Sequence, residues 1–316
     1  MSRRMLVAGG VTWTVLAGTF IAIVRPGAAV SIVLFCQGIL LLGLMYTVLT
    51  VRSASAEAKA SGASLIELNH QLSKGKQGNI SPLERKIRDE NDRVVTALGK
   101  AIRLNGRQTY RQLESLVNLN AMIPVDRPMP TTRGYAASPD MLMLLVDLIW
   151  RLRPGLVVEC GSGTSTLWMA RAIRHYGIVG RIVALEHEGK YAEITRATLA
   201  DHGLGDVAEV REAPLETFDI GGSEWQWYAS RAWKDIDNID LLFVDGPPGN
   251  MADKARYPAL PLLMDRLSPR GVVVADDLIR EDEREIVERW LDRYADFSVE
   301  YVRLEAGGAI LRRRSD

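Results

Sequence analysis

Short apolar segments alternate with amphipathic ones between residues 154 and 294, and this alternation constrains the fold more than any other feature of the chain. Five apolar segments are expected as strands, at residues 156–159, 181–185, 208–211, 239–244 and 271–275. The intervening patterns predict helices at 165–175 and 190–202, and an apolar helix precedes them at 138–152. Such alternation predicts an α/β domain with a parallel sheet. A helix at 283–294 and two strands at 297–304 and 309–313, joined by EAGG, predict a final antiparallel hairpin.

The first expected strand ends in the sequence VVECGSGTST, in which Glu159 precedes Gly161 and Gly163. Glycine allows the backbone to approach a ligand closely, and a helix that begins near Ser165 offers free amide donors to an anion. A dinucleotide-binding turn would have a third glycine where this chain has Thr166. The motif therefore favours a nucleotide-like ligand other than a dinucleotide.

Acidic residues end the other expected strands. Glu186 ends the second strand, Asp245 follows the fourth, and Asp276 and Asp277 follow the fifth. Parallel sheets bind ligands at this edge, and three carboxylates there suit Mg²⁺ or another divalent cation. Alternatively, Asp276 and Asp277 cap the strand and pair with Arg280, while Asp245 orients the ligand or acts as a general base.

These motifs resemble those of class I S-adenosylmethionine-dependent methyltransferases, and within them small bacterial domains near the catechol-type O-methyltransferases. The stretches that carry the resemblance are VVECGSGTST, RIVALEHE, IDLLFVDGPPG, KARYPALPLL and GVVVADDLIRE, within residues 138–313. The resemblance implies a Rossmann-like sheet of seven strands that binds S-adenosylmethionine, with Glu159 at its ammonium and Glu186 at its ribose. The implied cofactor-binding residues are Glu159, Gly161, Ser162, Gly163, Ser165, Glu186, Ala213 and Asp245.

The resemblance also implies a metal site at Asp245, Asp276 and Asp277 and a catalytic role for Asp245. Lys254 and Arg256 are the basic residues nearest the site in the sequence, and either could hold an anionic substrate. Lys254 is also a candidate base, if its pKa is lowered. Otherwise each is a structural or solvated side chain. Two residues depart from the catechol-type pattern of a metal site. Asp277 stands where asparagine is usual, and the lysine that normally follows closely is missing after Asp245-Gly-Pro-Pro.

The first 52 residues predict a transmembrane helical hairpin. Residues 5–24 and 26–51 carry no charge, and each run exceeds or matches the roughly 20 residues that cross a bilayer. Arg25-Pro26-Gly27 suits the turn between them. Basic residues flank the outer ends, which places both ends and the C-terminal domain in the cytoplasm, at the inner membrane. A cleaved signal peptide is the alternative.

The remaining chain divides into a tether with amphipathic helices at 53–121 and a methyltransferase domain at 122–316. Ser81-Pro82-Leu83-Glu84 predicts a helix start, and Gly106 is expected to separate that helix from a shorter one. A homodimer through residues 81–121, or through the first transmembrane helix, is a further hypothesis.

An insert rich in tryptophan and tyrosine, residues 221–236, is expected as a lid, an acceptor wall or a cover for the core.

The amino-acid composition of the chain narrows the classes of partner that it can bind. The 39 basic and 39 acidic residues balance, which argues against nucleic acid as a partner. The two cysteines and four histidines show neither disulfide nor zinc-ligand spacing. The prediction is a membrane-anchored O-methyltransferase that acts on a small molecule, a saccharide or a lipid-linked acceptor. The alternatives are N- or carboxyl-methylation of a small metabolite, and a non-catalytic scaffold.

Overall fold

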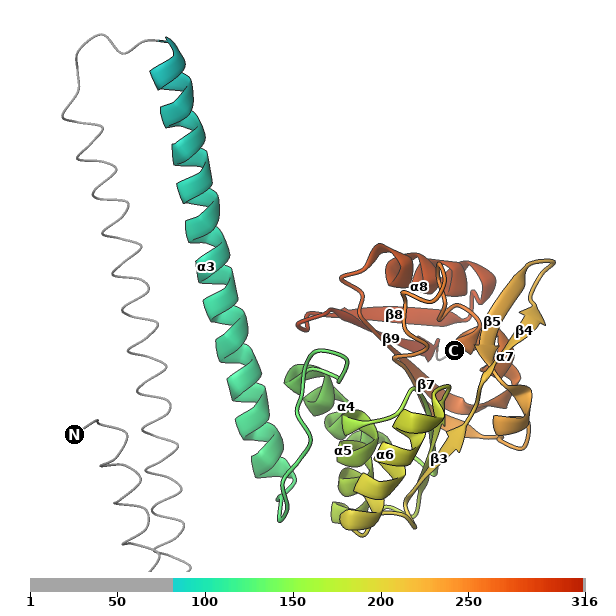
Figure 1. The fold of residues 1–316 in the computed structure, drawn as a ribbon. Coiled ribbons are helices and arrows are strands. Elements are labelled where there is room, and N and C mark those ends of the chain that lie inside the picture. The colour runs from blue at the N-terminus through green and yellow to red at the C-terminus, as the bar shows by residue number, and fades with distance from the viewer. Residues whose placement is uncertain (1–81, 315–316) are drawn as a thin grey trace, which may run out of the picture. The chain divides into compact units, whose positions relative to one another are not determined.

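The computed structural model describes residues 82–314, excluding the side chains of residues 82–87. The chain divides after Gly106 into two units, and the second unit contains the sheet. Along the chain the elements of the second unit begin with the end of helix α3 (Pro82–Met122) and continue with α4 (Pro139–Leu152). Figure 1 labels these elements and the sheet that follows them.

The central sheet has seven strands in the order β3-β2-β1-β6-β7-β9-β8. Strands β1, β2, β3, β6 and β7 run parallel, whereas β9 pairs antiparallel with both β7 and β8. This arrangement confirms the predicted parallel sheet with a C-terminal antiparallel hairpin. The strands are β1 (Leu156–Cys160), β2 (Arg181–Glu186), β3 (Ala208–Glu212), β6 (Ile239–Val244), β7 (Leu267–Asp276), β8 (Phe297–Val302) and β9 (Gly308–Arg313).

The strand order creates a position where a ligand can bind. The chain proceeds from β1 to β2 and β3 on one side and then returns to place β6 on the other side of β1. The loops that leave β1 and β6 therefore diverge at the carboxyl ends of two neighbouring strands. Doubly wound sheets bind ligands in the crevice that opens at such a point.

Two hydrophobic clusters cover the two faces of the sheet. Alternate residues of β1 belong to different clusters, with Val157 in one and Val158 in the other, as expected for side chains that alternate across a strand. Helices α4, α5 (Thr164–His175) and α6 (Gly189–Asp201) pack on the first face. Helices α7 (Ala259–Leu263) and α8 (Glu281–Arg293) pack on the second face, where Trp290 is fully buried.

The aromatic insert contributes strand β5 (Glu224–Tyr228) to a separate two-stranded sheet with β4 (Leu215–Asp219), the segment just before it, and this sheet was not predicted from the sequence. The short helices η1 (Ser230–Ala232) and η2 (Met264–Arg266) complete this region. Trp227 and Tyr228 have no exposed surface, and Trp233 is 7% exposed. Of the three roles expected for this insert, the structure therefore supports a cover for the core.

Helix α3 runs without interruption from Pro82 to Met122. The predicted break at Gly106 is wrong, because a single glycine inside a helix costs only about 1 kcal/mol relative to alanine. The helix start is close to the position that the capping pattern predicts. Leu119 and Ile123, at the end of the helix, are buried in the first hydrophobic cluster.

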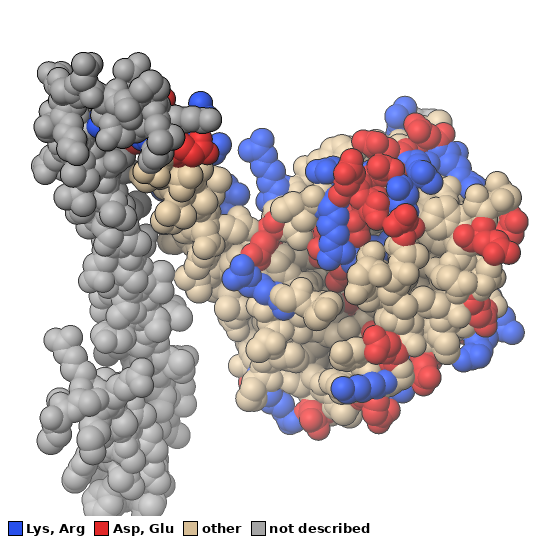
Figure 2. Space-filling view, turned by 45° about the horizontal axis from the view of Figure 1, so that its top comes forward, with Lys and Arg blue, Asp and Glu red and all other residues tan. Residues whose placement is uncertain are grey.

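The predicted transmembrane hairpin and most of the tether lie outside the described residues. Within residues 82–314, no helix is both long and apolar enough to span a bilayer. On the face that Figure 2 shows, acidic and basic side chains are intermixed over the C-terminal domain.

Candidate active site

Glu159 is a buried carboxylate at the end of β1, with only 1% of its surface exposed. Thr166 donates a hydrogen bond of 2.6 Å from Oγ1 to Glu159 Oε2, and the Ser165 hydroxyl donates to Oε1. Burial raises the pKa of Glu159 to about 7, although the hydrogen bonds from Ser165 and Thr166 oppose the shift. A buried carboxyl group whose pKa is about 7 can ionise near neutral pH, and its negative charge then pairs favourably with a cationic ligand.

The backbone of the turn leaves space beside this carboxylate. Gly161 and Gly163 have φ values of 106° and 148°, a region that favours glycine. A Cβ on Gly163 would meet no atom within 4 Å. Helix α5 begins immediately afterwards, and the Gly163 amide donates to Thr166 Oγ1 at 2.9 Å. The turn thus combines open space with the amino-terminal end of a twelve-residue helix, where anions bind favourably.

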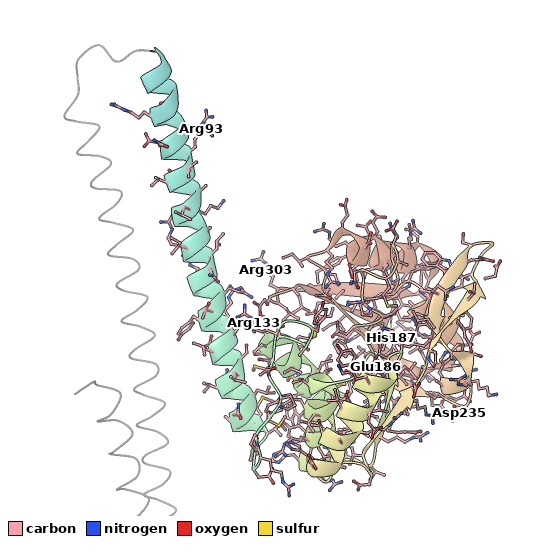
Figure 3. The ribbon with its side chains drawn as sticks, viewed as in Figure 1. Arg93, Arg133, Glu186, His187, Asp235 and Arg303 are labelled. Carbon is pink, nitrogen blue, oxygen red and sulfur yellow. The ribbon has the colours of Figure 1, made fainter. Side chains whose placement is uncertain are left out.

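Glu186 ends the neighbouring strand β2 and lies beside His187, as Figure 3 shows. Glu186 Oε1 is 3.0 Å from His187 Nδ1 and accepts a hydrogen bond of 3.1 Å from the Glu188 amide. Ser162 donates to Oε2 at 3.0 Å. Burial acts to raise the pKa of Glu186, but these hydrogen bonds outweigh it and lower the pKa. The hydrogen bond to Glu186 raises the pKa of His187.

Ala213, another of the expected cofactor-binding residues, is hydrogen-bonded to the main chain of Glu186. The amide of Ala213 donates to the carbonyl oxygen of Glu186 at 2.7 Å, and Ala213 is fully buried. The loop after β3 therefore lies against the end of β2. Glu159, Ser162, Glu186 and Ala213 consequently occupy adjacent strand ends on one edge of the sheet.

Asp245 follows β6 and has 20% of its side chain exposed. Its carboxylate Oδ1 lies 3.4 Å from Nη2 of Arg256, a residue that is 4% exposed. Burial raises the pKa of Asp245 to about 7, against the lowering influence of Arg256. Asp276 is also buried, and burial raises its pKa well above the usual range. Asp245 is thus a carboxyl group at the ligand-binding edge that can exchange a proton near neutral pH.

The three carboxylates of the expected metal site do not fit a divalent cation. Within residues 82–314, no group of three or more acidic, histidine or cysteine side chains is arranged as a metal site. Arg256 instead places Nη2 2.9 Å from Asp277 Oδ2 and 3.4 Å from Asp245 Oδ1. Asp276 accepts a hydrogen bond of 2.7 Å from the backbone amide of Asp277. Arg280 Nη2 also lies 3.1 Å from Asp277 Oδ2, so the structure agrees with the alternative in which these carboxylates cap the strand and pair with Arg280.

Lys254 does not face Asp245. Its Nζ lies 3.0 Å from Glu285 and 3.5 Å from Asp282, both on α8. Lys254 has a φ of 54°, and this left-handed residue turns its side chain toward α8. The hydrogen bond with Glu285 raises the pKa of Lys254, whereas a lysine that acts as a base needs a lowered pKa. The geometry thus removes the basis for expecting Lys254 to act as a base.

Tyr228 is a site residue that sequence reasoning grouped with the aromatic insert and did not single out. Its hydroxyl is buried and has no hydrogen-bond partner within the described structure. A Cβ built on Gly246 would lie 2.3 Å from the Tyr228 Oη, so this hydroxyl lies directly against the turn after β6. No sequence signal marks the residue, because it reaches the site from β5, which lies outside the main sheet.

Comparison with known proteins identifies the domain that carries this site. Residues 158–278 match the family described as "Methyltransferase domain". This part of the chain is similar to a methyltransferase domain. It includes Glu159, the glycine turn, Glu186 and Asp245, so the residues that the resemblance selected lie within the matched segment.

Individual relatives agree with this assignment. A catechol O-methyltransferase from Mycobacterium tuberculosis is 35% identical over 158 residues, which are 48% of this chain and 60% of that protein. A catechol O-methyltransferase from Niastella koreensis is 27% identical over 151 residues, or 47% of this chain and 60% of that protein. The chain therefore covers 60% of the length of both relatives.

One solved structure of similar fold is an O-methyltransferase from Bacillus cereus in complex with S-adenosylhomocysteine. It is 21% identical, with a TM-score of 0.45, and the match covers 65% of this chain and 91% of that one.

Within the matched segment, the structure brings several of the predicted residues together. Glu159, Ser162 and Glu186 are brought together at the ends of β1 and β2, with Gly161 and Gly163 in the turn between them. The Ser165 hydroxyl donates a hydrogen bond to Glu159, and Ser165 is only 6% exposed. Its side chain therefore helps to position Glu159.

Proposed function

We propose that this protein transfers the methyl group of S-adenosylmethionine to a hydroxyl oxygen of an acceptor. The observation that carries the proposal is the pairing of two buried carboxylates at neighbouring strand ends, Glu159 beneath the glycine turn and Glu186 beyond it. Each has 5% or less of its surface exposed. Two carboxylates kept so close to an open turn indicate a ligand with one cationic group and one group that donates hydrogen bonds.

S-adenosylmethionine has the chemistry that these residues require. Its ammonium matches Glu159, its ribose hydroxyls match Glu186, and its carboxylate matches the free amides at the start of α5. When bound, it supplies a methyl group activated by a positively charged sulfur. The relatives from the catechol O-methyltransferase group support the choice of this donor and of oxygen as the acceptor atom.

Asp245 is the residue that we assign to the acceptor proton. In methyl transfer, a carbon–oxygen bond forms while the carbon–sulfur bond breaks, its electron pair stays on sulfur, and the acceptor hydroxyl loses its proton. A carboxylate with a pKa of about 7 can take that proton at neutral pH. Asp245 also lies at the divergence between β1 and β6, where the acceptor and the donor must meet.

We further propose that the domain works at the cytoplasmic face of the inner membrane. The support comes from the sequence, namely the two uncharged runs at residues 5–24 and 26–51 and the basic residues outside them. A membrane-anchored enzyme meets lipid-linked acceptors at high local concentration, which favours a saccharide or lipid-linked hydroxyl as the substrate. The tryptophans of the insert no longer support this choice, because Trp227 and Trp233 pack in the core.

Helix α3 supports the proposal of a homodimer. Val94, Leu98 and Ile102 recur every four residues, and each is between 48% and 57% exposed. Residues at this spacing share one face of a helix, where they could pack against the same helix of a second copy. Light scattering of the full chain in detergent tests this, and a monomer would argue against it.

The proposed activity is tested with S-adenosylmethionine labelled on its methyl group. Membranes from cells that lack the protein supply the acceptor, and purified full-length protein supplies the enzyme. We expect labelled product with the wild type and a loss of at least about 100-fold with Asp245→Asn, since general-base catalysis contributes roughly that much or more. Unchanged transfer by Asp245→Asn would overturn the role of Asp245, and transfer to amine or carboxyl groups alone would overturn O-methylation.

A further inference from the structure

Arg256 is a buried cation at the edge of the sheet where β6 and β7 end. It lies on the segment between β6 and α7, and only 4% of its surface is exposed. Buried arginines are rare unless their charge is paired. The partners of this side chain therefore indicate what it does.

Each of the three guanidinium nitrogens has a partner. Nε donates to the carbonyl oxygen of Pro247 at 3.3 Å, and Nη1 donates to that of Asp276 at 3.4 Å. Nη2 donates to Asp277 Oδ2 at 2.9 Å. The guanidinium thus connects the turn after β6 with the end of β7, two segments that are about thirty residues apart in the sequence.

The same Nη2 atom lies 3.4 Å from Asp245 Oδ1. A positive charge is therefore already placed between Asp245 and Asp277, two of the carboxylates that catechol-type relatives would use for a divalent cation. A metal ion bound by both side chains would lie beside the guanidinium, and the two positive charges would repel each other strongly in a buried site. Because of this repulsion, either the arginine side chain or a metal ion can occupy this position, but not both.

A second arginine, Arg280, also pairs with the carboxylates around Arg256. Arg280 Nη2 lies 3.1 Å from Asp277 Oδ2, and its Nη1 lies 3.3 Å from Glu283 Oε1. Glu283 is 4% exposed, and its Oε1 lies 3.9 Å from Arg256 Nε. The carboxylates around β7 and the start of α8 are thus shared between two guanidinium groups.

We propose that Arg256 takes over the positioning role of a divalent cation, so that methyl transfer by this protein requires no metal ion. The proposal rests on the proposed methyltransferase function. Arg256 holds the Asp245 carboxylate against the end of β7, and it does so as a positioning residue, because its own donors are all engaged by the protein. The acceptor then meets Asp245 and the methyl donor without a bridging metal.

The wild-type protein gives the first test, and this test needs no knowledge of the acceptor. Full-length protein with bound S-adenosylhomocysteine is titrated with Mn²⁺, and bound Mn²⁺ is followed by electron paramagnetic resonance. We expect no stoichiometric Mn²⁺ binding at millimolar metal and no change in melting temperature with Mg²⁺. Stoichiometric Mn²⁺ binding that disappears in Asp277→Asn would overturn the proposal.

The same experiment separates the two proposals. Calorimetry first shows whether S-adenosylhomocysteine binds. If the wild type binds this ligand and also binds Mn²⁺, only the proposed role of Arg256 is contradicted, and the proposed function still stands. A wild type that does not bind the ligand contradicts the proposed function, and with it the inference that depends on that function.

Variants of Arg256 give the second test. Arg256→Met removes the cation that lies between Asp245 and Asp277, and we expect Mn²⁺ affinity to rise by at least about tenfold, the scale on which neighbouring groups tune metal sites. Arg256→Lys keeps a positive charge, so we expect it to bind no Mn²⁺ and to retain part of the transfer activity of the wild type in EDTA. A folded Arg256→Met protein that gains no Mn²⁺ affinity would overturn the proposal.

Arg171→Met is the matched control. Arg171 is an ion-paired side chain, 12% exposed, that contacts Asp126 on the other face of the sheet. Its loss should change stability without creating Mn²⁺ binding. If Arg256→Met does not fold, the Arg256→Lys variant and the wild-type titration still decide the question, because neither requires that the charge be removed.

Discussion

The affinity for S-adenosylhomocysteine should depend on pH through Glu159. The pKa of this carboxyl in the free protein is raised to about 7, with burial as the largest cause. Only the ionised form can pair with the ligand's ammonium, so the apparent dissociation constant equals the intrinsic one divided by the ionised fraction. That fraction is about 0.9 at pH 8 and about 0.09 at pH 6 for a group with this pKa.

We therefore predict that affinity falls about tenfold between pH 8 and pH 6, equivalent to about 1.4 kcal/mol. The sign follows from the raised pKa. Acidification protonates Glu159 in the free protein, and the ligand must then displace that proton in order to bind. Isothermal titration calorimetry at several pH values measures the effect.

Glu159→Gln provides the decisive comparison. This variant keeps the shape of the side chain and retains His187, whose pKa is raised by its hydrogen bond with Glu186, but it removes the carboxylate. We expect weaker binding at pH 8 and little remaining pH dependence relative to the wild type. Glu300→Gln, on β8 and with its side chain 64% exposed in the wild type, should behave like the wild type. If Glu159→Gln shows the same tenfold change with pH as the wild type, the assignment of the ammonium to Glu159 is refuted.

Three further predictions concern neighbouring residues. Glu186→Ala should weaken S-adenosylhomocysteine binding by at least about tenfold in calorimetry, because hydrogen bonds to charged groups contribute roughly 1.5–3 kcal/mol; unchanged affinity would contradict the ribose role. Lys254→Met should leave methyl transfer nearly unchanged, since its ammonium pairs with α8, and a large loss would restore it as a candidate base. Tyr228→Phe should raise the stability of the ligand-free protein by about 1 kcal/mol in chemical denaturation, because an unpaired buried hydroxyl is removed; destabilisation would indicate a missed partner.

Much of the main sheet could be predicted because each strand carries its own local signal. The apolar runs are short, they are bounded by glycine, proline or acidic residues, and helical patterns separate them. The glycine turn and the acidic residues that follow β1 and β2 were likewise visible in the sequence. A parallel sheet then brings these strand ends to one edge without any further information.

The remaining features depend on contacts between segments far apart in the sequence. Arg256 could be seen as a charged residue near the site, but its place between Asp245 and Asp277 depends on how the loop after β6 folds back. Lys254 is only two residues away and faces α8 instead. The β4–β5 hairpin, which includes part of the aromatic insert, could not be predicted because its two strands pair only with each other. Gly106 was over-interpreted, since a helix tolerates one glycine when its length and neighbours favour it.

The most direct test of the central claim is a calorimetric comparison of S-adenosylhomocysteine and NAD on the same purified full-length protein. We expect one molecule of S-adenosylhomocysteine to bind per chain, in competition with S-adenosylmethionine, and no heat of binding for NAD. Binding of NAD without binding of S-adenosylhomocysteine would contradict the account of the glycine turn, Glu159 and Glu186 given above.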